Sequence, residues 1–244
     1  MTKYTKVYNV RSLEMDSEYL LKKMEVSRYF QETFALYCKD KKLAAFDIVD
    51  RNLFWVVSEM HIEFTGEMPF WSEEVSVTVW VSEITKLRIY VDFEIHYKGK
   101  IIAKGDSLWF ILNSNTRHPI NPTELLKDFE VYNEPVFGEH SKFGFEENGT
   151  LLFEKDYKVG IFDLDFNHHM NNIKYTAFAI NTVSNEYLAT HEIKSYKIKF
   201  IKECFFDDEI KCQFFESKEH SFFIQTRKSD NAVVCKIETI AQNK

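Results

Sequence analysis

Strict alternation of apolar and polar residues in two consecutive segments is the strongest constraint on the fold. From residue 75 to 81 every odd position is Val, and from Leu87 to Tyr97 every odd position is apolar. Successive side chains of a β-strand point to opposite faces of a sheet, so this period predicts strands with one buried face. A turn at residues 98–100 separates the second segment from a third apolar run, residues 101–112, which predicts an antiparallel hairpin.

The same order of elements is predicted twice along the chain. In each half a strand and a helix precede a series of strands. The first half has a strand near residues 6–11 and a helix near 17–37. The second half has a strand near 153–161, a helix from Asn172, and strands near 194–202, 208–217, 221–227 and 233–241.

Sequence similarity between the halves supports a duplication. Residues 24–29 align with residues 170–175 at an offset of 146, and Glu67 aligns with Glu203 at an offset of 136. A long helix wrapped by a curved antiparallel sheet and duplicated in one chain predicts an α+β fold, with two hotdog folds in tandem packed as a pseudo-dimer.

The region between the two halves is rich in residues that break regular structure. Three of the four prolines and three of the seven glycines lie between Asn113 and Gly149. We therefore expect an N-terminal domain at residues 1–130, a linker at 131–147 and a C-terminal domain at 148–244.

Composition excludes several classes of protein. Hydrophobic residues make up 45% of the 244 residues, which is typical of a globular protein with a packed core. The formal charge of −7 argues against a nucleic-acid partner, because phosphate binding needs clustered Lys and Arg. No apolar run approaches the roughly 20 residues of a membrane span.

The N-terminus and the cysteines bear on the cellular location. Met1 leads into a strand-like pattern without a signal or transit segment, which predicts a cytoplasmic location. The four cysteines have no spacing typical of a metal site or a disulfide framework, so we expect reduced thiols. They are Cys38, Cys204, Cys212 and Cys235.

The densest group of polar side chains lies at the start of the second predicted helix. Residues 165–172 read Asp-Phe-Asn-His-His-Met-Asn-Asn, and an apolar helical pattern follows. The N-terminus of a helix offers unpaired N–H groups and a positive dipole end beside these imidazoles, amides and carboxylate. This arrangement favours a functional site.

The pattern Asp165-x-Asn167-x-His169-x-Asn171-Asn172-x-x-Tyr175, followed by Lys202-Glu203-Cys204, resembles the active-site pattern of the acyl-acyl carrier protein thioesterases. Residues 53–60 and 107–110 also look like segments of this family. The resemblance runs from about residue 8 to residue 241. It implies hydrolysis of a fatty acyl thioester carried on acyl carrier protein, without a cofactor or a metal.

The resemblance implies a catalytic set of Asp165, Asn167, His169 and Glu203. Thioester hydrolysis needs a positioned water, a base and donors for the oxyanion. His169 and Glu203 are the candidates for activating water, Asn167 for orienting water or substrate, and Asp165 for fixing the geometry. The division of these roles stays open.

Simpler interpretations compete for the same residues. Asn171, Asn172 and Asp165 are also typical capping residues at a helix start, and His168 is expected to point elsewhere. A metal site would need a third ligand in register with Asp165 and His169. Cys204 near His169 would suit a covalent mechanism, although the carboxylate of Glu203 beside it would not favour a thiolate.

The alignment of the halves predicts a single active site. At the offset of 146 the counterparts of Asp165, Asn167 and His169 are Tyr19, Leu21 and Lys23, which cannot replace them. We therefore expect the N-terminal half to hold the acyl chain. Its candidate pocket residues, for which simple core packing is the alternative, are Phe30, Phe34, Trp55 and Met60.

Docking of an acidic carrier protein should use local positive charge. Residues 1–147 hold 18 Lys and Arg against 24 Asp and Glu, whereas residues 148–244 hold 13 against 14, which favours the C-terminal half. The candidate docking residues, which could also form a solvated sheet face, are Lys194, Lys197, Lys199 and Lys202.

Three functions are compatible with these residues. The first is hydrolysis of fatty acyl-acyl carrier protein, the second is hydrolysis of acyl-CoA by the same fold, and the third is a non-catalytic acyl-binding protein. Intact Asn167, His169 and Glu203 argue against the third. A homodimer is left as a possibility.

Overall fold

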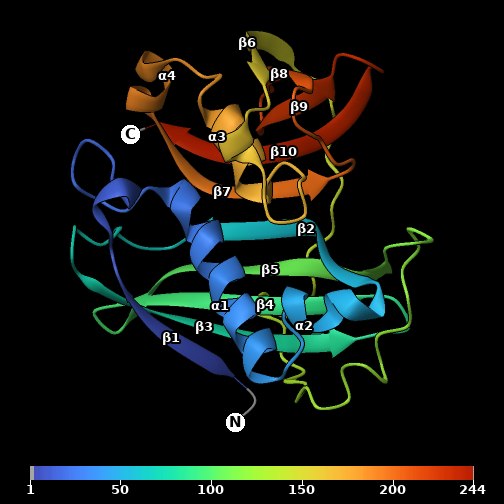
Figure 1. The fold of residues 1–244 in the computed structure, drawn as a ribbon. Helices are drawn as coiled ribbons and strands as arrows, with labels where there is room; N and C mark the ends of the chain where they lie inside the picture. Colours follow the sequence, from blue (N-terminus) through green and yellow to red (C-terminus); the bar gives the residue numbers. More distant parts are fainter. Residues whose placement is uncertain (1–2, 244) are drawn as a thin grey trace. The chain divides into compact units, whose positions relative to one another are not determined.

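The computed structural model describes residues 3–243. These residues form two compact units, which divide between residues 142 and 143. Each unit combines one antiparallel five-stranded sheet with helices (Figure 1). The predicted α+β class with two hotdog folds in tandem is confirmed. The linker and domain boundaries predicted from Pro and Gly stay a prediction.

The N-terminal unit has its strands in the order β1-β3-β4-β5-β2. The predicted hairpin at residues 98–100 is confirmed, because β4 and β5 pair antiparallel across it. The strands are β1 (Tyr4–Asn9), β2 (Leu53–Phe64), β3 (Glu74–Ile84), β4 (Ile89–Tyr97) and β5 (Lys100–Asn113), and the helices are η1 (Ser12–Glu14), η2 (Lys23–Glu25), α1 (Val26–Asp40), α2 (Ala45–Ile48) and η3 (Val49–Arg51).

The core of this unit lies between α1 and one face of the sheet. The predicted inward positions of β3 and β4 are buried except for Tyr97, which is partly exposed, and the rings of Phe30 on α1 and Phe93 on β4 stack with centroids 3.6 Å apart. Two details of the prediction are wrong. Leu87 precedes β4 and is exposed, and helical structure begins at Lys23 rather than Ser17, because a tight turn with Tyr19 at φ 63° comes first.

Residues 131–142, called the strap below, cover part of the second face of this sheet, which the sequence predicts to be exposed. The strap is fixed by two buried carboxylates that lie opposite each other on neighbouring strands, Asp92 on β4 and Asp106 on β5. Val136 N–H donates to Asp92 Oδ1 (2.7 Å), and Ser141 N–H donates to Asp106 Oδ2 (2.6 Å). Polar positions of an alternating strand can therefore be buried when a segment covers them.

Burial of Asp92 should make stability depend on pH. Burial is the main cause that raises the pKa of Asp92 to about 6, and the neighbouring Asp106 raises it further, against the opposing effects of Ser82, Val136 and His140. The folded state thus binds this proton more tightly than the unfolded chain. Its stabilising contribution is present below about pH 4 and is lost as the pH rises through about 6.

We expect Asp92→Asn to stabilise the protein at pH 8 by about 1 to 3 kcal/mol, and to have little effect at pH 4. Asn keeps the oxygen that accepts from Val136 and carries no charge. Urea denaturation of the wild type and the variant at both pH values measures the difference. Glu94→Gln on the same strand removes a less buried charge and serves as the control. Destabilisation by Asp92→Asn at pH 8 would contradict the prediction.

The C-terminal unit has its strands in the order β7-β10-β9-β8-β6. The predicted strand at residues 221–227 and the predicted helix start at Asn172 agree with the structure. The strands are β6 (Thr150–Lys158), β7 (His191–Phe200), β8 (Glu209–Glu216), β9 (Ser221–Arg227) and β10 (Ala232–Asn243), and the helices are η4 (Ile161–Asp163), α3 (Asn172–Ile180) and α4 (Asn185–Thr190).

The helix α3 packs against β8, β9 and β10 through a mostly apolar face. Tyr175, Phe178 and Ala179 are buried on this helix. One polar contact crosses the core, because the buried Gln225 of β9 donates from Nε2 to the carbonyl oxygen of Tyr175 (2.6 Å). The contact links the first turn of α3 directly to the sheet.

Within residues 3–243, no helix is both long enough and apolar enough to cross a membrane.

Candidate active site

The polar cluster predicted at the start of the second helix forms a tight turn that leads into α3. Asp165 N–H donates to the His169 carbonyl (2.8 Å), and His168 N–H donates back to the Asp165 carbonyl (3.1 Å). The Asp165 carboxylate accepts from the N–H groups of Asn167 (2.8 Å) and His169 (3.3 Å). His168 lies at φ 61° with its side chain exposed, so it points away, as predicted.

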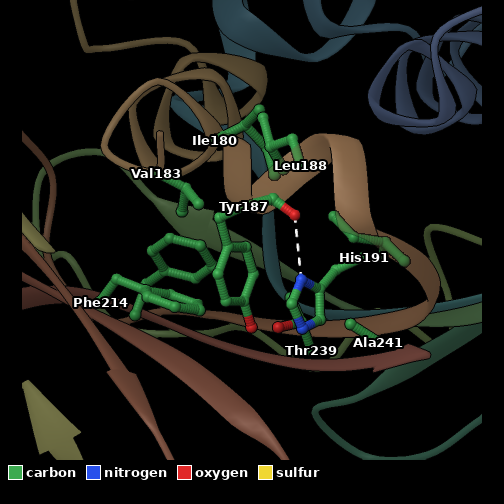
Figure 2. Close-up of a pocket in the computed structure, with 10 residues that line it drawn as sticks. Ile180, Val183, Tyr187, Leu188, His191, Phe214, Thr239 and Ala241 are labelled. Carbon is green, nitrogen blue, oxygen red and sulfur yellow. Dashed lines mark hydrogen bonds between the residues drawn. The ribbon is translucent and has the colours of Figure 1, made fainter. Parts of the chain in front are cut away.

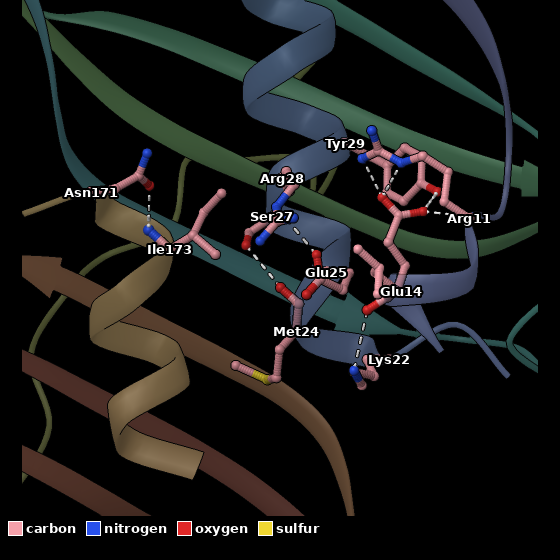
Figure 3. Close-up of polar contacts among 11 residues, drawn as sticks. Arg11, Glu14, Lys22, Met24, Glu25, Ser27, Arg28, Tyr29, Asn171 and Ile173 are labelled. Carbon is pink, nitrogen blue, oxygen red and sulfur yellow. Dashed lines mark hydrogen bonds and ion pairs between the residues drawn. The ribbon is translucent and has the colours of Figure 1, made fainter. Parts of the chain in front are cut away.

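Asn171 caps the helix that follows. Its side-chain oxygen accepts from the N–H of Ile173 (3.0 Å), and Asn172 is the first helical residue (Figure 3). Short polar side chains satisfy the free N–H groups at a helix start in this way. The capping interpretation of Asn171 is confirmed.

His169 and Glu203 come together although 34 positions separate them in the sequence. His169 Nδ1 lies 3.3 Å from Glu203 Oε1, and the two side chains are 21% and 32% exposed. The Phe205 ring packs edge-on against the imidazole, with centroids 5.0 Å apart. The pair is therefore held on one side by an aromatic ring and stays open to a small reactant.

The N-terminal unit contains a second turn with the same hydrogen bonds at an offset of 149. Asp16 N–H donates to Leu20 O (2.9 Å), and the Asp16 carboxylate accepts from the N–H groups of Glu18 (2.9 Å) and Leu20 (3.1 Å). Tyr19 has the positive φ that His168 has. The predicted offset of 146 is therefore wrong by three residues at this turn.

The acidic residue before each turn follows the same offset. Glu14 accepts from Arg11 N–H (2.9 Å), as Asp163 accepts from Gly160 N–H (2.9 Å). In the N-terminal unit Glu14 also accepts from the side chain of Arg11 and from the Tyr29 hydroxyl (2.6 Å), as Figure 3 shows. The two turns are thus built on one local plan.

The corrected register changes which residues correspond. Asp165 corresponds to Asp16, Asn167 to Glu18 and His169 to Leu20. A backbone hydrogen bond anchors each turn to a neighbouring loop. Leu21 N–H donates to Pro69 O (2.9 Å), and Met170 N–H donates to Cys204 O (2.8 Å), so Pro69 corresponds to Cys204. The residue before that carbonyl is Met68 in one unit and Glu203 in the other, so Glu67 is not the counterpart of Glu203.

Asp165 therefore differs in kind from the other predicted catalytic residues. Its counterpart, Asp16, makes the same backbone contacts on a turn that carries neither an imidazole nor the paired glutamate. The contacts of Asp165 are those of a residue that shapes the turn. Asn167, His169 and Glu203 are the additions found in the C-terminal unit.

Cys204 has none of the features of a reactive thiol. The side chain is fully buried, at 0% exposure, and burial raises the pKa of the Cys204 thiol. Its thiol lies beside the Tyr175 hydroxyl. A nucleophilic cysteine needs an accessible thiolate, so this environment argues against the covalent alternative.

We expect Cys204→Ala to keep kcat within about three-fold of the wild type, because the thiol does not reach a substrate. Thioester hydrolysis by the purified variant measures this, and mass spectrometry of the wild type during turnover should show no acyl-enzyme. A folded but inactive Cys204→Ala protein would favour the covalent mechanism with Cys204 as the nucleophile. Circular dichroism distinguishes that outcome from unfolding.

Both halves of the chain match models of known protein domains. Residues 1–129 match the acyl-ACP thioesterase N-terminal domain, and residues 147–243 match the acyl-ACP thioesterase C-terminal domain. The chain belongs to the acyl-ACP thioesterase family. The resemblance seen in the motif at residues 165–175 is thus confirmed along both units.

Curated relatives are plant enzymes that are longer than this chain. The chloroplastic acyl-acyl-carrier-protein hydrolase FATB3 of Cuphea viscosissima is 28% identical over 219 residues, which cover 81% of this chain and 51% of the relative. The chloroplastic palmitoyl-acyl carrier protein thioesterase of Gossypium hirsutum is 25% identical over 215 residues, with 82% and 52% covered. The chain spans about half the length of these relatives.

Two solved acyl-ACP thioesterase structures share the fold. An acyl-ACP thioesterase from Bacteroides thetaiotaomicron has a TM-score of 0.85 at 22% identity, covering 99% of this chain and 98% of that one. The 12:0-ACP thioesterase from Umbellularia californica has a TM-score of 0.85 at 20% identity, covering 100% and 98%.

The residues predicted to hold the acyl chain lie inside the N-terminal unit of this acyl-ACP thioesterase family member. Phe30, Phe34 and Met60 line a narrow apolar space together with Trp109 and others. Trp55 packs edge-on against Phe34 (5.5 Å between centroids) and donates from Nε1 to a backbone carbonyl (2.8 Å). The structure brings the four together, and their role with substrate stays a prediction.

The four lysines predicted for carrier docking have mixed surroundings. Lys194 pairs with Glu192 (2.6 Å), and Lys197 lies 3.7 Å from a carboxylate oxygen of β10. Lys199 and Lys202 are exposed, and Lys202 lies directly beside Glu203 in the chain. Docking at these residues stays a prediction.

The sequence reading missed two features of the C-terminal unit. One is Arg227 at the end of β9, which contacts the backbone of Glu203. The other is a mostly apolar pocket, shown in Figure 2, in which the rings of Tyr187 and His191 stack 3.9 Å apart and His191 Nδ1 lies 3.0 Å from the Tyr187 carbonyl. The only sequence pattern that could have indicated this pocket is the spacing of four positions between Tyr187 and His191.

Among residues 3–243, no group of three or more His, Cys, Asp or Glu side chains is arranged to hold a metal ion.

Proposed function

We propose that this chain hydrolyses the thioester of a fatty acyl group carried on acyl carrier protein, releasing the free fatty acid and the carrier. The observation that carries the proposal is the contact of 3.3 Å between His169 and Glu203, in a chain whose two units both match this family. The names of the curated relatives support the substrate class.

The pair suits the activation of water. Glu203 holds one ring nitrogen of His169, Nδ1, and thereby leaves the other, Nε2, for the proton of an attacking water. The water oxygen bonds to the thioester carbon and the C–S bond breaks. The proton taken up by His169 then passes to the thiolate of the leaving phosphopantetheine, which balances the reaction.

Other parts of the prediction enter as supporting roles. Asn167 would orient water or substrate from the same turn. The acyl chain would enter between Phe30, Phe34, Trp55 and Met60, whose packed side chains would have to move apart to admit it. The four lysines predicted for docking would meet the acidic carrier. The cytoplasmic location and the homodimer remain predictions.

The test is hydrolysis of a panel of saturated and unsaturated acyl chains, each presented on acyl carrier protein and on coenzyme A. We expect turnover with the carrier protein at a kcat/KM well above that with coenzyme A. Comparable kcat/KM values on both carriers would favour the acyl-CoA alternative. Binding of the acyl chains without any turnover would favour the non-catalytic alternative.

Asp165 should act as an acceptor for backbone N–H groups rather than through its charge. We expect Asp165→Asn to keep kcat within about five-fold, because the amide oxygen can still accept from Asn167 and His169. Asp165→Ala should lower kcat by roughly ten-fold or more. Asp16→Ala, which removes the same contacts in the other unit, is the matched control and should leave kcat unchanged. Equal inactivity of Asp165→Asn and His169→Ala would show that the charge takes part.

A further inference from the structure

The short segment between β7 and β8, which carries Glu203, is held by its backbone on both sides of that residue. Lys202 N–H donates to the Val234 carbonyl of β10 (3.2 Å). The Cys204 carbonyl accepts from Met170 N–H (2.8 Å), which joins the segment to the turn that bears the catalytic imidazole. The direction of the Glu203 side chain therefore depends on backbone contacts.

Two side chains add contacts at the carbonyls of this segment. The buried Tyr175 donates from its hydroxyl to Lys202 O (3.3 Å), and Arg227 donates from Nη1 to Glu203 O (2.9 Å). The guanidinium is itself fixed, because its Nε and Nη2 donate to the two carboxylate oxygens of Asp230 (3.1 and 2.8 Å). A guanidinium held at two nitrogens presents the third in a defined direction.

In the described part of the N-terminal unit, from residue 3 onward, different residues stand at the places of these two donors. At the offset of 149 the place of Tyr175 is taken by Val26, which has no hydrogen-bonding side chain. Tyr97 is the last residue of β4, as Arg227 is the last residue of β9, and the Tyr97 hydroxyl donates to Glu73. The two contacts thus accompany the paired imidazole and glutamate, and the turn itself forms without them.

We propose that Arg227 and Tyr175 are positioning residues, which hold the backbone of Glu203 so that its carboxylate stays in contact with His169. This inference rests on the proposed function of that pair. The contact of 3.3 Å leaves little tolerance, because hydrogen bonds weaken steeply at longer distances. Displacement of a catalytic group by about 1 Å can cost 100-fold in rate.

The test compares Arg227→Gln, Arg227→Lys and Tyr175→Phe in the full chain, with kcat and KM measured separately. We expect Arg227→Gln to lower kcat by about 10- to 100-fold with KM within about three-fold, since the acyl chain and carrier contacts are untouched. Arg227→Lys should recover part of the loss, because one ammonium can still donate to the carbonyl. Tyr175→Phe should lower kcat by a smaller factor.

Lys228→Gln is the matched control. It neighbours Arg227 on the chain and pairs with Asp156 and Glu209, away from Glu203, so kcat should not change. Arg227→Gln is also combined with Glu203→Gln. A positioning role predicts that the second change adds little to the loss caused by Glu203→Gln alone. A full independent loss in the double variant would overturn the inference.

A crystal structure of Arg227→Gln gives a readout that does not depend on activity. We expect the His169 Nδ1 to Glu203 Oε1 distance to lengthen beyond about 4 Å. If the wild type hydrolyses neither class of thioester, the proposed function fails and the distance still tests the positioning. An unchanged distance, or an Arg227→Gln enzyme with wild-type kcat, would overturn the inference.

Discussion

His169→Ala should lower kcat for thioester hydrolysis by about 1,000-fold while the fold is retained, the typical scale for loss of a general base being about 100- to 10,000-fold. The imidazole is part of the pair with Glu203 and half-buried at the surface, so its removal leaves no large cavity. Glu203→Gln should cost a comparable factor. Groups that act as a unit give non-additive losses, so the double variant should be little worse than either single one.

The neighbouring imidazole provides a control for this prediction. His168→Asn changes an exposed side chain at φ 61°, a conformation that Asn tolerates, and should keep kcat within about three-fold. Steady-state kinetics at saturating acyl-acyl carrier protein compares the four variants with the wild type. A fully active His169→Ala enzyme would contradict the assignment of the site. Equal losses in His168→Asn and His169→Ala would point to the turn as a whole.

Gly105→Ala should destabilise the N-terminal unit by about 3 kcal/mol or more, or prevent folding. A Cβ at this position would lie 2.1 Å from the backbone carbonyl oxygen of His61 on β2 and 2.3 Å from the Phe93 ring on β4. Phe93 cannot easily move aside, because its other face stacks on Phe30. Relief would require β5 to move away from its neighbours β2 and β4.

Gly144→Ala is the matched control, since a Cβ there meets no heavy atom within 4 Å and should change stability by no more than about 0.5 kcal/mol. Urea denaturation and the yield of soluble protein compare the two variants. Equal midpoints would show that the β2–β5 and β4–β5 pairs can accommodate a methyl group. The packing described for the core of this unit would then need revision.

Strands and helix starts with a strong local signal could be predicted from the sequence. The alternation of β3 and β4 and the cap at Asn171 are properties of neighbouring residues, and they were found. The burial of Asp92 was not, because it depends on the strap, whose Val136 lies 44 residues further along the chain. Alternation reports the two faces of a strand but does not report what covers them.

The part of the candidate site that consists of side-chain groups could be predicted from the sequence. His169 and Glu203 were named from the motif, and the structure brings them together. Arg227 was missed because it acts on a backbone carbonyl, a partner that has no sequence signature. The predicted register of the two halves was wrong because it aligned the identical residues Met24 and Met170. The two turns correspond through backbone hydrogen bonds, which leave no pattern in the sequence.

The two matching turns bear on how activity can be lost or gained in evolution. The turn with Asp16, Glu18 and Leu20 closes without an imidazole, so the side chains that we propose to react contribute little to folding. Substitutions at Asn167, His169 or Glu203 would therefore escape any selection that acts only on stability. Active and inactive descendants of such a chain would be equally well folded, and abundance in the cell would not tell them apart.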